Sequence, residues 1–273
     1  MLDDLTTCYR HDDRNAAVSC QRCERPVCTD CMTQASVGFH CPECLRSGGQ
    51  KVVRARDIGT AKPPVTVALI VINAAIHLLA PNVTIDELPL EFQGLLFGPL
   101  VQEGEWWRLI TSGFFHADLF HIGFNMFLLW TLGQGLERAL GPVRFGLIYL
   151  AGLLGGSLAV TIFQFETPTL GASGAVLGLA AAYVPLLWSQ GRSIRETPLG
   201  GLVILNLVLP LLSPRISFWG HAGGVAFGFA ASWLLMNLPE RYRKSTSASA
   251  AVLGGFCAVL FIAAVAIPSV LGY

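Results

Sequence analysis

Four polar residues stand in stretches that are otherwise almost entirely apolar, and their types are suited to nucleophilic catalysis. Ser173 lies in "GASGAVLG", His221 in "FWGHAGG", and His121 and Asn125 in "FHADLFHIGFNM". A serine hydroxyl becomes a good nucleophile when a neighbouring base such as histidine removes its proton. His121 and Asn125 are four residues apart on a predicted helix, so they share a face, and both side chains can donate to an oxyanion.

Each of these residues also has a simpler interpretation. A serine beside glycine in an apolar helix is most often a packing residue, and an isolated membrane histidine often only satisfies a neighbour's hydrogen bond. His77 and His116 are interpreted in that way, and His116 is expected to point well away from the face that carries His121. No acidic residue lies at the same depth within the predicted helices, so a two-residue catalytic unit of Ser173 and His221 is expected.

The cysteines form a second candidate site, because seven of the eight fall between Cys8 and Cys44. The pattern is Cys8-x2-His11, Cys20-x2-Cys23, Cys28-x2-Cys31 and Cys41-x2-Cys44. Four ligand pairs supply the eight ligands that two tetrahedral Zn²⁺ ions require, and metal binding would supply folding free energy to so small a module. Free or disulfide-bonded thiols are the simpler alternative.

The spacing of these ligands resembles a B-box or a related cross-brace zinc finger. That resemblance implies two ligand sets, which are Cys8, His11, Cys28 and Cys31 for one ion and Cys20, Cys23, Cys41 and Cys44 for the other. Sequential pairing of neighbouring ligand pairs stays open, and His40 could replace a cysteine. A closed tetrahedral site leaves no position for substrate, so a structural role is expected. The module could recruit a protein partner, whose nature the sequence does not give.

The composition predicts an all-α polytopic membrane protein. Of the 273 residues, 53% are hydrophobic and 13% are charged, whereas soluble domains carry about 25% charged residues. The net charge of zero gives no reason to expect a nucleic-acid partner. We expect helices at 64–81, 115–136, 143–165, 173–190, 198–213, 217–237 and 249–270, of which 198–213 is short for a membrane span. The apolar segment 82–114, which is broken by glycine and proline, is expected to lie partly in the outer interface.

Basic residues alternate between the loops that join these helices. Lysines and arginines concentrate before the first helix and in every second loop after it, whereas the other loops hold only Arg108 and Arg215. The positive-inside rule therefore predicts a cytoplasmic N-terminus and an external C-terminus. The expected organisation is a zinc module (1–47), a basic linker (48–63), a six-helix core (64–237), and a cytoplasmic loop with a seventh transmembrane helix (238–273).

Glycines at four-residue spacing favour close approach of two of the helices. Gly174 and Gly178 lie on one, and Gly220, Gly224 and Gly228 lie on the other. Small residues at this spacing let helix backbones pack tightly in a membrane, which would bring Ser173 within hydrogen-bond reach of His221. Because the helices that carry the four polar residues are expected to run in the same direction, all four should lie at a similar depth in the bilayer.

The core resembles the rhomboid family of intramembrane serine proteases. The matching stretches are "WR" (Trp107, Arg108), "HADLFHIGFN" (His116, His121, Asn125), "GQGLERALG" (Glu137), "GASG" (Gly171 to Gly174) and "GHAGG" (His221). The resemblance implies Ser173 as nucleophile, His221 as general base, and an oxyanion hole that includes His121 and Asn125. It implies structural roles for Trp107, Arg108, His116, Glu137, Gly171 and Gly174, and cleavage of transmembrane proteins within the lipid bilayer, near its outer leaflet. A non-catalytic rhomboid-like scaffold and a metal-ion transporter are the alternative hypotheses.

Overall fold

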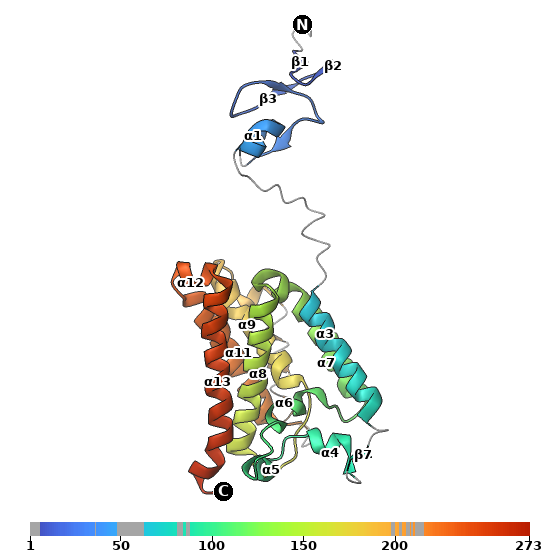
Figure 1. Cartoon of the computed structure of the whole chain (residues 1–273), viewed down its shortest axis with the longest axis vertical. Coiled ribbons are helices and arrows are strands. Elements are labelled where there is room, and N and C mark those ends of the chain that lie inside the picture. The colour runs from blue at the N-terminus through green and yellow to red at the C-terminus, as the bar shows by residue number, and fades with distance from the viewer. Residues whose placement is uncertain are drawn as a thin grey trace. The chain divides into compact units, whose positions relative to one another are not determined.

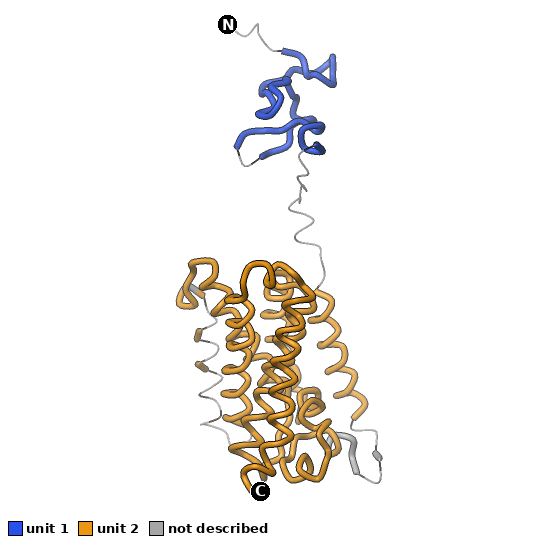
Figure 2. Tube along the Cα trace, turned by 60° about the vertical axis from the view of Figure 1, so that its left-hand side comes forward, with its two compact units in different colours: residues 1–61 blue, residues 62–273 orange. Residues whose placement is uncertain are grey.

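The computed structural model of the chain describes residues 6–35, 37–47, 63–80, 84–85, 88–197, 200–201, 204–205, 208, 210 and 216–273. The chain divides into two compact units, residues 1–61 and residues 62–273 (Figure 2). This division falls within the predicted basic linker.

Unit 1 is built from very short elements. Its strands pair as three two-stranded antiparallel sheets, β1 (Thr7–Cys8) with β2 (His11–Asn15), β3 (Val18–Ser19) with β4 (Pro26–Val27), and β5 (Thr33–Gln34) with β6 (Phe39–His40), followed by α1 (Pro42–Ser47) (Figure 1). The buried side chains that pack together are six cysteines, Ala16 and Val27. Strands this short are not stable alone, and a core made mostly of thiols has little apolar area to bury, so the unit depends on its cysteines.

Unit 2 is a bundle of long helices, seen in Figure 1 as nearly aligned ribbons. Among the described residues the long helices are α3 (Pro64–Leu79), α7 (Leu119–Leu140), α8 (Pro142–Phe163), α9 (Ser173–Ser189), α11 (Phe218–Asn237) and α13 (Thr246–Leu271). Helix α8 is the central one, with α9, α11 and α13 packed against it. By length and composition, α8 and α13 are apolar enough to cross a membrane, and α3 and α9 are shorter apolar helices.

Most of the predicted helix 198–213 lies outside the described residues. The other six predicted helices are present, with ends that differ by up to four residues. The prediction that one helix starts at 115 is wrong, because α7 begins at Leu119. Asp118 caps that helix by accepting a hydrogen bond from the backbone N–H of His121 at 2.8 Å. At the other end α7 continues to Leu140, and Gly141, with φ of +82°, joins it directly to α8.

The two ends of the described part of unit 2 lie at opposite ends of the bundle. The carboxylate of Glu137, near the end of α7, accepts hydrogen bonds from the backbone N–H groups of Val65 and Thr66 at 2.9 and 2.8 Å. The start of α3 therefore lies beside the end of α7, and Glu137 caps a helix whose N-cap, Pro63, offers no side-chain acceptor. The hydroxyl of Tyr273 donates to the carbonyl of Ile162, at the far end of α8.

A segment of short helices precedes α7 and is held together by one buried arginine. These are α4 (Leu90–Gly94), α5 (Gly98–Gln102), α6 (Arg108–Thr111) and the 3₁₀ turn η2 (Ser112–Phe114), after a small hairpin of β7 (Thr84–Ile85) and β8 (Leu88–Pro89). Arg108 is 4% exposed and pairs with Glu105 at 2.6 Å, while it also donates to the carbonyls of Phe92 and Leu95. Trp107 is half exposed and forms the N-cap of α6.

Candidate active site and metal sites

Ser173 and His221 come from different helices and meet in unit 2. Ser173 is the first residue of α9, and His221 lies in the first turn of α11. The Nε2 atom of His221 is 2.9 Å from the Oγ atom of Ser173, which is an ordinary hydrogen-bond distance. The pair that the sequence predicted is therefore within reach for proton transfer from the hydroxyl to the imidazole.

Glycines account for how closely these two helices approach. A Cβ atom built on Gly174 would lie 2.8 Å from the carbonyl oxygen of Gly220, and one on Gly178 would lie 2.9 Å from that of Gly224. Both distances are shorter than real Cβ contacts allow, and their order shows that α9 and α11 run parallel. The expected glycine contact between the helices is present, and it sets the separation at which Ser173 meets His221.

Gly171 lies two residues before Ser173 and has no room for a side chain. Its φ of +124° is in a region that non-glycine residues rarely adopt. A Cβ atom there would lie 2.8 Å from Nε2 of His121, and the Gly171 N–H donates to the carbonyl of Ser112 at 2.8 Å. Gly171 thus lets the chain turn tightly into α9 while the imidazole of His121 lies against the turn.

His121 and Asn125 both retain donors that could serve an oxyanion. The backbone N–H of Ala117 donates to Nδ1 of His121 at 3.4 Å, so the neutral ring carries its proton on Nε2, the atom nearest Gly171. Asn125 is buried, and its amide donates one N–H to the carbonyl of His121 at 2.9 Å, which leaves a second N–H. The two side chains share one face of α7, as the spacing predicted.

The prediction that His116 points well away from His121 is wrong. The two rings lie 5.0 Å apart, centre to centre. The backbone at Phe115 is extended, so helical periodicity does not apply before Leu119. Nε2 of His116 accepts a hydrogen bond from the backbone N–H of Ala172, the N-cap of α9, at 3.4 Å. His116 therefore supports the residue that precedes Ser173, which is compatible with the expected structural role.

A cavity of about 520 Å³ is lined by all four candidate residues of the site. It is also lined by polar residues that were not predicted as part of the site, among them Ser112, Asp118, Gln164 and Ser217. Ser217 donates to Gln164 at 2.6 Å and caps α11 by accepting from Gly220. Asp118 places an acidic group at the cavity, where its carboxylate accepts a hydrogen bond from the backbone N–H of His121. Asp118 and Ser217 are residue types that commonly cap helix N-termini. This preference could have identified both residues from the sequence.

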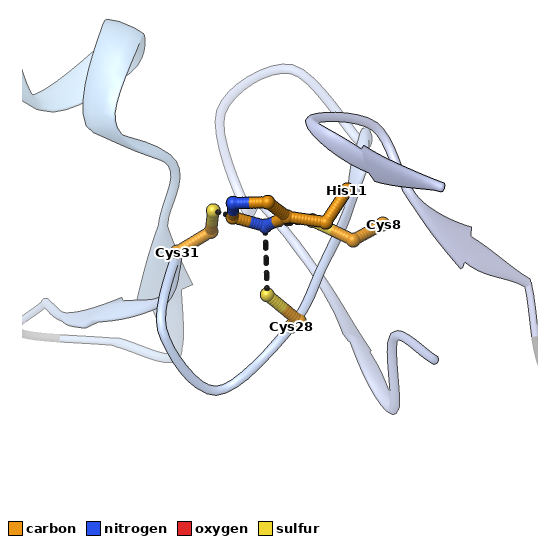
Figure 3. Close-up of side chains that lie close together, drawn as sticks. All are labelled: Cys8, His11, Cys28 and Cys31. Atoms are coloured by element: carbon orange, nitrogen blue, oxygen red, sulfur yellow. Dashed lines mark hydrogen bonds between the residues drawn. The ribbon is translucent and has the colours of Figure 1, made fainter. Parts of the chain in front are cut away.

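In unit 1, the first set of predicted metal ligands forms one cluster (Figure 3). The Nδ1 atom of His11 lies 3.8, 3.4 and 3.4 Å from the sulfurs of Cys8, Cys28 and Cys31. A tetrahedral Zn²⁺ with usual bond lengths separates its nitrogen and sulfur ligands by about 3.5–3.8 Å. The spacing of these four ligand atoms therefore fits a zinc ion.

Cys20, Cys23, Cys41 and Cys44 form the second cluster. The sulfurs of Cys23 and Cys41 are 3.7 Å apart, again close to the separation that a tetrahedral ion imposes. The two clusters follow the alternating pairing of a cross-brace finger and not the sequential one, and His40 belongs to neither. All eight cysteines are free thiols in the structure, so the disulfide alternative is not what the chain adopts here.

The surroundings of Cys8 and Cys20 favour the thiolate form that metals bind, whereas burial raises the pKa of Cys31 to about 11 and the contact with Cys23 raises the pKa of Cys44 to about 12. Burial raises the pKa of Cys20, but N–H groups of Cys41, Arg22 and Cys23 point at its sulfur and lower that pKa to about 6 overall. Burial likewise opposes the N–H groups around Cys8, where the net effect lowers the pKa to about 6. A metal ligand must lose its proton, so both environments prepare the sulfur for a cation.

Comparison with known proteins places the candidate active site in a recognised domain. Residues 103–238 match the Rhomboid domain. The rhomboid protease GluP of Bacillus subtilis is 37% identical over 145 residues, covering 52% of this chain and 28% of GluP. RHOMBOID-like protein 2 of Arabidopsis thaliana is 34% identical over 186 residues, covering 64% and 58% of the two chains.

Rhomboid-type serine protease 2 of Emericella nidulans is 34% identical over 166 residues, covering 56% of this chain and 32% of that protein. The chain therefore spans between 28% and 58% of the length of these three relatives. The matched segment contains Ser173, His221, His121 and Asn125 and ends before α13. The part of this chain that carries the candidate active site thus matches the Rhomboid domain.

Proposed function

We propose that this chain is an intramembrane serine endopeptidase in which Ser173 is the nucleophile and His221 the general base. The observation that carries the proposal is the 2.9 Å contact between Oγ of Ser173 and Nε2 of His221 beside a 520 Å³ cavity. The chain is an integral membrane protein, with a Rhomboid domain and long apolar helices, and its relatives include proteins named as rhomboid and serine proteases.

The proposed reaction begins when Oγ of Ser173 attacks a peptide carbonyl while Nε2 of His221 takes the hydroxyl proton. The carbonyl oxygen then carries negative charge, which Nε2–H of His121 and the free amide N–H of Asn125 can stabilise. Backbone N–H groups at the start of α9 add donors, because the first N–H groups of a helix have no partner within it. His221 next gives its proton to the leaving amine, and water hydrolyses the acyl-enzyme.

The proposed substrates are transmembrane proteins cut near the outer leaflet. A helical backbone keeps its carbonyls hydrogen-bonded, so the substrate must unwind locally before Ser173 can attack it. The cavity offers polar partners for such an unwound segment, among them Ser112, Gln164 and Ser217. The basic loops support a cytoplasmic position for the end of the bundle that is remote from Ser173.

Active-site labelling with a fluorophosphonate, together with cleavage of a transmembrane reporter, tests this proposal. The wild-type protein should be labelled and should cleave the reporter, whereas Ser173→Ala should do neither. A non-catalytic scaffold would give no labelling in either protein, so the same experiment separates the two hypotheses.

We further propose that unit 1 binds two structural zinc ions through its two clusters. The ligand separations of 3.4 to 3.8 Å support this assignment, as do the N–H groups that point at the sulfurs. Four protein ligands complete each tetrahedron, so the ions would hold the fold and leave no position for a substrate. Measurement of the zinc content per chain tests the assignment.

A further inference from the structure

A second cavity lies at the other end of α9 from Ser173. Its volume is about 280 Å³, and its walls include Leu140, Leu186 and Leu235, with Arg144, Arg243 and Ser189 as its polar lining. Ser189 is sixteen residues after Ser173 on the same helix, which corresponds to about 24 Å at 1.5 Å per residue. The cavity is therefore remote from the candidate active site and belongs to the opposite end of the bundle.

Neutral groups hold the two arginines in place. Arg144 donates to the hydroxyl of Ser249 at 2.8 Å, to the carbonyl of Arg243 at 2.7 Å and to that of Leu140 at 3.4 Å. Arg243 donates to the carbonyl of Met236 at 3.1 Å. Two of these carbonyls belong to the last turns of α7 and α11, where a helix carries about half a negative charge. These contacts orient the guanidinium groups without supplying a full countercharge.

Within the part of the chain that the structure describes, no carboxylate pairs with Arg144 or Arg243. A guanidinium has five N–H donors, so among the described residues the bonds above leave two on Arg144 and four on Arg243. Both side chains are partly buried. Arg108 differs from these two arginines, because its buried guanidinium forms an ion pair with Glu105. Two partly buried positive charges beside one cavity call for an anion.

We propose that this cavity binds the headgroup of an anionic phospholipid. Arginine forks match phosphate oxygens in geometry and charge, and Arg144 and Arg243 would hold the phosphate with the Ser189 hydroxyl nearby. The leucine walls suit the glycerol and the first carbons of the acyl chains. Basic pockets between helices at the cytoplasmic face of a membrane are typical lipid-headgroup sites, and this end of the bundle also carries Arg138 and Lys244.

The test measures lipid binding to the full-length protein in a neutral detergent by native mass spectrometry, with a melting curve for each sample. Phosphatidylglycerol, phosphatidylcholine and inorganic phosphate are compared. The wild-type protein should prefer phosphatidylglycerol to phosphatidylcholine by about tenfold or more, because the net negative charge of the headgroup meets two arginines. Inorganic phosphate alone should bind more weakly than phosphatidylglycerol, because it gains nothing from the apolar walls.

Arg243→Gln is the informative variant, because it removes one charge and the side-chain hydrogen bond to the carbonyl of Met236. It should reduce the preference for phosphatidylglycerol to within about threefold. Arg138→Gln is the matched control, since Arg138 is exposed, bonds to Gln134 and does not line the cavity. It should keep the wild-type preference. If Arg243→Gln does not fold, Arg243→Lys replaces it. Because lysine keeps the charge, the logarithm of the affinity ratio between phosphatidylglycerol and phosphatidylcholine should stay at least half of its wild-type value.

Three results would overturn the proposal. The first is that the wild-type protein binds the two lipids with equal affinity. The second is that Arg138→Gln loses as much of the preference for phosphatidylglycerol as Arg243→Gln does. The third is that inorganic phosphate binds as strongly as phosphatidylglycerol. The last result would indicate a site for a free anion. Fluorophosphonate labelling of the same samples is independent of the lipid measurement, so failure of the protease assignment would not be mistaken for failure of the lipid site.

Discussion

Ser173 and His221 contact each other directly, so in the proposed mechanism each depends on the other for catalysis. Replacing Ser173 with alanine removes the proposed nucleophile, and replacing His221 with alanine removes the proposed base that deprotonates it. Both variants should lose reporter cleavage and probe labelling while they keep the wild-type melting temperature. Because the two residues act as a unit, the double variant should be no worse than either single one. Substantial cleavage by Ser173→Ala would contradict the assignment.

His121 and Asn125 should behave differently from His116. Loss of one oxyanion donor typically lowers kcat by about 10²–10³, because that bond strengthens only as charge develops. His121→Ala and Asn125→Ala should therefore slow reporter cleavage strongly, change the melting temperature little and still permit some probe labelling. His116→Ala removes the acceptor for the N–H of Ala172, so it should lower the melting temperature at least as clearly as turnover.

Melting temperature and cleavage rate measured on all three variants decide this point. Normal cleavage by Asn125→Ala, together with slow cleavage and an unchanged melting temperature for His116→Ala, would show that the two roles are reversed.

Single residues were predictable where local spacing determines their arrangement. The four-residue interval predicted that His121 and Asn125 share a face, and the glycine pattern predicted contact between the helices of Ser173 and His221. The position of His116 was mispredicted because a helix was assumed to begin at 115. Asp118, which starts the helix three residues before His121, could have corrected that assumption.

At the scale of elements, the glycine contact between α9 and α11 should be intolerant of even one methyl group. A Cβ atom on Gly224 would overlap the backbone of Gly174, the residue after Ser173, so Gly224→Ala must push the helices apart. Overpacking of this kind typically costs about 1–3 kcal/mol, and a small displacement of Ser173 from His221 lowers catalysis further. The Gly224→Ala protein should melt at a lower temperature and react with the fluorophosphonate probe more slowly than the wild type.

Gly254 of α13 is the matched control for this substitution. A Cβ atom there meets nothing within 4 Å, and alanine favours helix, so Gly254→Ala should equal or exceed the wild type in melting temperature. If the two variants lose stability equally, the loss reflects helical glycine in general and not the α9–α11 contact.

Hydropathy predicted that the helices exist, but not how their ends are arranged. Asp118, Ser217 and Ser245 each cap a helix through a side-chain oxygen, and these bonds set starts that an apolar window places only to within a few residues. The apolar segment before α7 was predicted only to lie partly in the outer interface, and its short helices depend on the buried Arg108, whose partners lie up to sixteen residues away along the chain. Contacts of that kind leave no periodic signal in a sequence.

For the whole molecule, the proposed orientation has a cytoplasmic N-terminus and an external C-terminus. The start of α3 and Tyr273 lie at opposite ends of the bundle, which supports an odd number of crossings. Reporter fusions at residue 50 and after Tyr273 should therefore report opposite sides of the membrane. Reporting from the same side would contradict both the orientation and the leaflet proposed for Ser173.

Unit 1 shows how a sequence can predict ligands without predicting the elements that hold them. The two-residue gaps predicted the eight residues that the structure gathers into two clusters, because that spacing lets both ends of a pair reach one ion. No strands were predicted here, and the observed ones are mostly two residues long. Segments so short carry no alternation of apolar and polar residues, so their pairing follows from the clusters.

The last prediction concerns the metal content of unit 1. The purified full-length protein should contain about two zinc ions per chain by elemental analysis, since eight ligands form two tetrahedra. Cys28→Ser and Cys41→Ser each remove one ligand from a different cluster, so each should lower the content to about one. Cys257→Ser is the matched control, because this thiol lies in α13 outside both clusters, and it should keep both ions. Units 1 and 2 are separate compact units, so neither cluster variant should abolish probe labelling at Ser173. A wild-type content below about one ion, or a loss of zinc from Cys257→Ser, would contradict the assignment of the two clusters.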